Sequence, residues 1–169
     1  MRDIVAMDFG SLRSHEQRVD ANVRLGGYHM DKHSPTAEFQ VYGAVLDSID
    51  WLRLYLLGEF AQHTWGTTAR VVDVDRSALS PQSTKKIATF YETDPSRNWL
   101  PLDLRRLPEL AIIAVASNIE TSSLTITDGN HRAIAQCWRH GPTSDVPIIV
   151  CVHRNIKQWP FIPHHARTR

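Results

Sequence analysis

Apolar side chains recur at steps of three and four residues between positions 35 and 57. They are Phe39, Tyr42, Leu46, Ile49, Leu52 and Leu56. The charged residues of this stretch fall on the opposite side of a helix drawn through it. Ser34 is a good helix cap, and Pro35 fits the first helical position. The pattern predicts an amphipathic helix over 35–57 that ends near Gly58.

Shorter stretches of alternating or continuous apolar residues predict strands. They cover residues 4–7, 71–75, 110–116, 124–127 and 145–152. The polar residues 117–123 join two of these stretches, so we expect an antiparallel hairpin there. A second helix is predicted to begin at Ser80-Pro81 and to stop at Asp94-Pro95. The remaining segments are expected to be largely irregular: 11–33, 98–110 and 153–169.

The stretch from Leu124 to Arg139 combines a strand, a polar turn and a helix. Within the helix, spacing at i, i+3 and i+4 predicts one buried face and one face toward solvent or a ligand. The buried face holds Ile134, Cys137 and Trp138, and the other face holds Arg132, Gln136 and Arg139. Gly141 followed by Pro142 is predicted to end this helix.

The turn itself, residues 128–132, has the sequence Asp-Gly-Asn-His-Arg. Either Asp128 or Asn130 can cap the helix that follows, which leaves other N–H groups of the first turn without an intrahelical partner. A glycine permits close approach of a ligand to the backbone, and an arginine in the first turn adds positive charge. These features suit a phosphate or another anion. An ordinary structural helix cap is the alternative interpretation.

The chain has 169 residues and a net charge of +1, which fits one globular domain and gives no global electrostatic argument for nucleic-acid binding. A local basic patch can still draw on Arg132, Arg139, Arg154, Lys157, Arg167 and Arg169. Cys137 and Cys151 are expected to be small buried hydrophobes. No apolar block has the length of a signal peptide or of a membrane span. We therefore expect a cytoplasmic protein that does not enter the membrane.

The order of predicted elements around this turn resembles the ParB/sulfiredoxin superfamily. In that family an I-x-D-G-x-H-R turn, matched here by residues 126–132, precedes a helix of small residues and a V-P-V-like strand, matched by Val146-Pro147-Ile148. The resemblance covers about residues 70–152. It implies an α+β fold, with helices packed on a small mixed sheet. The expected organisation is an N-terminal helical extension (1–69), a ParB/sulfiredoxin-like core (70–153) and a C-terminal tail (154–169).

The resemblance also implies a phosphate-binding pocket at the turn. Gly129, Asn130, His131 and Arg132 would surround the phosphates of a nucleotide or nucleic acid, and Asp128 would fix the turn or hold a metal. The implied ligand is a nucleoside triphosphate, ATP or CTP, with Mg²⁺. Hydrolysis of a phosphoester or phosphoanhydride bond, as in a nuclease or an NTPase such as an ATPase, would use His131 as general acid or base with Asp128 and Arg132.

The chain departs from the family pattern in two places, and each departure removes one family function from this expectation. The sulfiredoxin branch needs a cysteine where this chain has Asn130, so reduction of a sulfinic acid is not expected. A helix-turn-helix and a dimerisation region after the turn are not recognisable, so a complete centromere-binding partition protein is not expected either.

A second hypothesis is a non-catalytic interaction or inhibitor protein on a ParB-like scaffold. Proteins of this general kind serve plasmid maintenance or inhibit the transfer of DNA or effectors. Here the predicted helix 35–57 would bind another protein. The hypothesis requires this helix to expose apolar side chains.

Other polar and aromatic residues have a plainer structural interpretation. Asp73 and Asp75 alternate with valines and are expected on the solvent face of a strand. Adjacent histidines in a tail are usually incidental, tryptophans usually fill a core, and paired basic residues usually face solvent. The residues concerned are His164, His165, Trp51, Trp65, Trp99, Trp159, Lys85, Lys86, Arg105 and Arg106. His63 is a further candidate to approach the turn.

Overall fold

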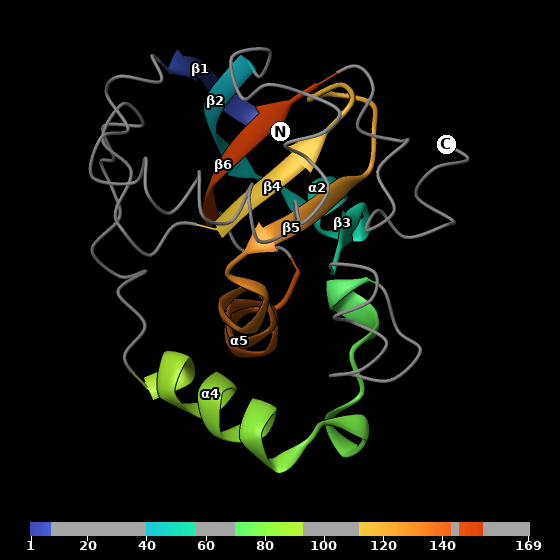
Figure 1. The fold of residues 1–169 in the computed structure, drawn as a ribbon, viewed down its shortest axis with the longest axis vertical. Coiled ribbons are helices and arrows are strands. Elements are labelled where there is room, and N and C mark those ends of the chain that lie inside the picture. The colour runs from blue at the N-terminus through green and yellow to red at the C-terminus, as the bar shows by residue number, and fades with distance from the viewer. Residues whose placement is uncertain (8–39, 57–69, 93–111, 143–145, 154–169) are drawn as a thin grey trace, which may run out of the picture.

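The computed structural model describes residues 1–7, 40–56, 70–92, 112–142 and 146–153. This part of the chain has an α+β fold, with one mixed sheet and the helices α2 (Ser48–Leu52), α4 (Pro81–Glu92) and α5 (Asn130–His140) (Figure 1). The strands are β1 (Arg2–Met7), β2 (Gln40–Leu46), β3 (Leu54–Tyr55), β4 (Ile112–Ala116), β5 (Leu124–Asp128) and β6 (Val146–Val152).

The sheet has the strand order β1-β2-β6-β4-β5-β3. β2 is antiparallel to β1 and β6, β4 is parallel to β6, and β5 is antiparallel to β4 and parallel to β3. The predicted hairpin of β4 and β5 is confirmed, as are the strands at β1 and β6. The sheet takes strands from both sides of residue 69, where the sequence analysis places a boundary between an extension and a core.

The predicted amphipathic helix over 35–57 is wrong in its described part, residues 40–56. These residues form β2, the short helix α2 and β3. Alternate side chains of β2 enter opposite faces of the sheet, and Ala44 and Val45 are both buried, so the strand is apolar on both sides and shows no alternation. The apolar residues at three- and four-residue steps belong to three separate elements, β2, α2 and β3, so their spacing only imitates a helical period.

Asp47 fixes the change from strand to helix. Its carboxylate accepts hydrogen bonds from the N–H groups of Ile49 (3.0 Å) and Asp50 (3.1 Å), while Asp50 accepts one from the Asp47 N–H (2.9 Å). This reciprocal pair is a capping box, which starts α2 directly after β2.

The predicted strand over 71–75 is also wrong. Val71–Asp73 and Arg76–Ala78 are short 3-10 turns, η4 and η5. Val71 and Val74 are the buried residues of this segment, and their spacing of three matches a 3-10 turn rather than the period of two that a strand requires.

The main core lies between one face of the sheet and the helices. It joins alternate residues of β2, β4, β5 and β6 to Trp51 of α2, Val71 of η4, Ile87 of α4 and Ile134 of α5. Figure 1 shows α5 between the sheet and α4. Helix α4 begins where expected, because the Ser80 hydroxyl accepts the N–H of Ser83 (3.2 Å).

The cysteine prediction is confirmed, since Cys137 and Cys151 are both buried free thiols. Burial raises the pKa of each thiol, that of Cys151 to about 12. Gln136 was expected to face solvent or a ligand, but it is buried. Within the described ranges, no helix combines the length and apolarity needed to cross a membrane.

Candidate functional site

The turn at residues 128–132 lies where β5 ends and α5 begins. Asp128 is the last residue of β5 and pairs with Ile113 of β4, and Asn130 is the first residue of α5. The strand, turn and helix predicted for this stretch are confirmed. In Figure 1 the β5 arrow points toward α5, so the sheet delivers the turn directly to the start of the helix.

Gly129, rather than Asp128 or Asn130, is the N-cap residue of α5. Its backbone has φ 89° and ψ 20°, in the left-handed region, which glycine adopts at little cost. A Cβ atom at this position would lie 3.3 Å from the Ile112 Cα and 3.5 Å from the Arg132 Nη1. Glycine therefore serves both the turn conformation and the close packing against β4.

The capping of α5 differs from that of the other two helices. Asp47 caps α2 and Ser80 caps α4 with side-chain oxygens, whereas the N-cap residue of α5 makes no side-chain capping hydrogen bond. The positive end of the α5 dipole is therefore not neutralised by an N-cap side chain.

Arg132 connects the turn to α4. Its Nη2 lies 3.4 Å from a carboxylate oxygen of Asp128, a long distance for a charge-assisted hydrogen bond. Its guanidinium carbon lies 5.5 Å from the centre of the Phe90 ring, within the range of a cation–π interaction. Arg132 is thus held over the start of α5 from two directions.

His131 lies beside Arg132 in the first turn of α5. Burial, and then the positive charge of Lys86, lower the pKa of His131 to about 4. The imidazole is therefore neutral at neutral pH. A neutral ring can still accept a proton, but a pKa near 4 makes it a weak base.

Asn130 is the most enclosed polar residue of the turn. It is 7% exposed, and its Oδ1 is a buried atom without a hydrogen-bond partner. Native structures leave few such atoms unsatisfied, because the cost of desolvation is not recovered.

The fit of a metal depends on how the ion would be held. In the described part of the chain, His, Cys, Asp and Glu side chains form no group of three or more that could hold a metal ion. Mg²⁺ in nucleotide sites is commonly held by one or two carboxylates together with substrate phosphates and waters. Asp128 can supply one such carboxylate.

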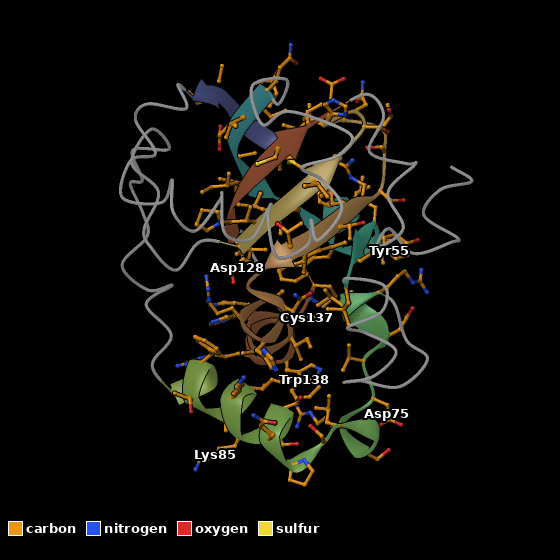
Figure 2. All side chains as sticks on the ribbon, in the orientation of Figure 1. Tyr55, Asp75, Lys85, Asp128, Cys137 and Trp138 are labelled. Atoms are coloured by element: carbon orange, nitrogen blue, oxygen red, sulfur yellow. The ribbon has the colours of Figure 1, made fainter. Side chains whose placement is uncertain are left out.

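Sequence reasoning missed the contribution of α4. Lys86 and Phe90 are four residues apart and therefore share a side of the helix, and this side faces the turn. Lys86 is exposed, as expected, but its positive charge also acts on His131; the spacing from Lys86 to Phe90 and the buried Ile87 are readable signals of this side of the helix. Lys85 projects from the outer side of α4 (Figure 2).

Three of the remaining candidates lie within the described residues. Trp51 is buried in the core, as expected. Asp73 pairs with Arg70, and Asp75 accepts a hydrogen bond from the N–H of Ser77; both acids are exposed, as expected. The other candidates lie outside the described residues: His63, His164, His165, Trp65, Trp99, Trp159, Arg105, Arg106, Arg154, Lys157, Arg167 and Arg169.

Comparisons of the whole chain with models of protein families, with curated proteins and with solved structures found no match.

Proposed function

We propose that the chain binds the phosphate groups of a nucleotide or nucleic acid at residues 128–132 and hydrolyses a phosphoester or phosphoanhydride bond. The observation that carries the proposal is the position of Arg132, over a helix start whose N-cap makes no side-chain capping hydrogen bond. The ParB/sulfiredoxin-like character of the core belongs to this proposal. Its support is the Asp-Gly-Asn-His-Arg turn in a strand–turn–helix setting.

Electrostatics around the turn favour an anion. Lys86 of α4 brings positive charge close to His131 and contributes to the low pKa of that imidazole, and Arg132 follows His131 in the first turn of α5. Asp128 lies 3.4 Å from Arg132. A phosphate at the start of α5 would meet the helix dipole and the Arg132 guanidinium together.

Hydrolysis needs an activated water in addition to binding. A nucleoside triphosphate, ATP or CTP, with Mg²⁺ is the ligand we propose, and Asp128 would hold the cation through its carboxylate. Bound Mg²⁺ supplies charge neutralisation on the phosphoryl oxygens. His131, neutral near pH 7, would accept a proton from water, and Arg132 would stabilise negative charge as the bond breaks.

Calorimetry with ATP, CTP and GTP, with and without Mg²⁺, tests the binding step. We expect Arg132→Ala to weaken binding by about tenfold or more, the usual effect of losing a charge-assisted hydrogen bond. Arg139→Ala removes the same side chain from the far end of α5 and serves as the matched control. Absence of binding by the native protein, or equal effects of the two variants, would reject the site.

Release of inorganic phosphate, and cleavage of DNA, test the chemical step. His131→Ala is expected to abolish turnover while leaving binding largely intact, because its neutral ring contributes little charge to the site. Full activity in this variant would remove His131 from the mechanism and leave a binding protein.

An interaction or inhibitor protein is the second candidate, and one observation favours it. Ile49 is 71% exposed and Leu52 is 55% exposed, both on α2. They are three residues apart, so they form one small apolar surface. Because the predicted helix 35–57 does not form over residues 40–56, we now assign the surface for a protein partner to Ile49 and Leu52. Ile49→Ser with Leu52→Ser should remove partner binding without unfolding the protein; a retained complex would reject the pair as the contact.

A further inference from the structure

A cavity of about 550 Å³ lies at the end of the sheet opposite the 128–132 turn. It is lined by Gln40, Tyr42, Ser117, Asn118, Ile119, Val152 and His153. β4 and β6 are adjacent parallel strands, and both point away from α5 in Figure 1. The segments that follow them meet here, where the His153 N–H donates to the Ala116 carbonyl (2.9 Å). Ligands of open sheets commonly bind beyond the carboxyl ends of parallel strands.

The charge of the lining restricts the ligand. The cavity is lined by carboxamides, hydroxyls, one imidazole and the apolar side chains of Ile119 and Val152, with no acid, lysine or arginine among them. Gln40 and Asn118 are exposed at the opening of the cavity, and a charged ligand would meet no carboxylate, ammonium or guanidinium group among the lining side chains. The cavity volume lies within the range of small-molecule sites, so the lining favours an uncharged small molecule.

The two carboxamides offer donors rather than acceptors. Tyr42 donates its hydroxyl hydrogen to Oε1 of Gln40 (3.0 Å). Oδ1 of Asn118 accepts the N–H groups of Glu120 (2.9 Å) and Thr121 (3.1 Å). Both carbonyl oxygens are therefore engaged within the protein, and each side chain keeps its NH₂ group for a ligand.

The loop that carries Asn118 is held in place before any ligand arrives. Ser122 Oγ accepts the N–H groups of Ser117 (3.1 Å) and Asn118 (3.0 Å) and donates to the Asn118 carbonyl (2.6 Å). Arg53 donates to the carbonyl oxygens of Ile119 (2.8 Å) and Ser122 (2.7 Å). A donor fixed in this way loses little entropy on binding.

We propose that this cavity is a second binding site, which takes an uncharged, acceptor-rich heterocycle of the nucleobase type, as a free base or nucleoside. The NH₂ groups of Gln40 and Asn118 would donate to ring carbonyl oxygens or ring nitrogens, the pairing by which amide side chains read base edges. The Tyr42 ring and the aliphatic side chains would contact the flat face of the heterocycle. The site goes beyond the proposed function, because it lies at the other end of the sheet and needs no phosphate.

Two substitutions remove the donors and keep the internal hydrogen bonds. Gln40→Glu retains an oxygen for Tyr42, and Asn118→Asp retains one for the N–H groups of Glu120 and Thr121, while each replaces NH₂ by an acceptor. Gln82→Glu, at an exposed position of α4, makes the same change of charge away from the cavity and is the matched control.

The experiment titrates uridine and adenosine into the full chain by calorimetry and by backbone amide NMR, with methyl glucoside and acetate as comparison ligands. We expect at least one nucleoside to bind with shifts at residues 117–119 and 152–153. Gln40→Glu and Asn118→Asp should each weaken binding about tenfold or more, and Gln82→Glu should leave it unchanged.

Three results would overturn the proposal. They are no nucleoside binding by the native chain, equal binding by the two cavity variants and the control, and stronger binding of methyl glucoside or acetate than of either nucleoside. None of these results depends on residues 128–132, since both nucleosides lack phosphate. Failure here is therefore separate from failure of the phosphate site.

Discussion

The guanidinium carbon of Arg132 lies 5.5 Å from the centre of the Phe90 ring, which ties the first turn of α5 to α4. The same guanidinium reaches back to Asp128 at the end of β5. One side chain therefore joins three elements, and the orientation of the candidate phosphate site depends on the packing of α4.

Phe90→Ala should lower the free energy of unfolding by about 1–2 kcal/mol, because it removes both the cation–π contact and part of the apolar packing. Phe90→Leu keeps apolar volume without the ring and should cost less. Urea denaturation followed by circular dichroism measures both. Equal losses for the two variants would assign the whole effect to the aromatic ring, and no loss in Phe90→Leu would show that packing alone holds Arg132.

Gly129→Ala should cost about 1–2 kcal/mol of stability, because alanine is strained at the positive φ of this turn. Gly129→Asn should cost less, since asparagine enters the left-handed region more readily. Thermal unfolding gives the comparison. If both variants lose the same amount, contact of the new Cβ with Ile112 outweighs backbone strain.

The pKa of His131, lowered to about 4 by burial and by Lys86, should rise toward its ordinary value of 6.5 in Lys86→Gln. NMR titration of the imidazole protons measures the change. Lys85→Gln removes an equal charge from the outer side of α4 and should leave the pKa nearly unchanged. Matching shifts in the two variants would mean that Lys86 does not face His131.

Stability should fall between pH 6.5 and pH 4, because the unfolded chain takes up a proton at His131 that the folded chain does not. This contribution is complete above pH 6.5 and is lost as the pH falls toward 4. Allowing for screening by solvent around a half-buried ring, we expect about 1–2 kcal/mol. Urea midpoints at several pH values measure it. His131→Gln should flatten the dependence; an unchanged slope would assign it to other groups.

Asp50→Asn should cost about 3 kcal/mol, because Asp50 is buried and pairs with Arg53 (2.6 Å) and with the Met1 amino group (2.9 Å). Removing one partner leaves buried positive charge uncompensated. Asp73→Asn breaks an exposed pair with Arg70 and should cost less than about 1 kcal/mol. Chemical denaturation of both variants tests the contrast, which similar losses would contradict.

Local sequence signals were enough to locate the elements that begin or end at a cap, a glycine or a polar turn. Ser80-Pro81 marked the start of α4, Gly141 marked the end of α5, and the polar turn between Ala116 and Leu124 marked the hairpin. The sequence also located the 128–132 turn. These features are local, because capping, glycine conformation and turn chemistry depend on neighbours along the chain.

Features that depend on burial by residues distant in the sequence could not be read from local patterns and emerge from the packing of the fold. β2 is buried on both faces, so its sequence lacks the alternation that marks a strand, and residues 40–56 were misread as a helix. The side of α4 that meets the turn was fixed by packing against α5, which brings Lys86 and Phe90 to His131 and Arg132. Gln40 and His153 line the same cavity because β2 pairs with β6. Local periodicity does not predict such pairing of strands distant in the sequence.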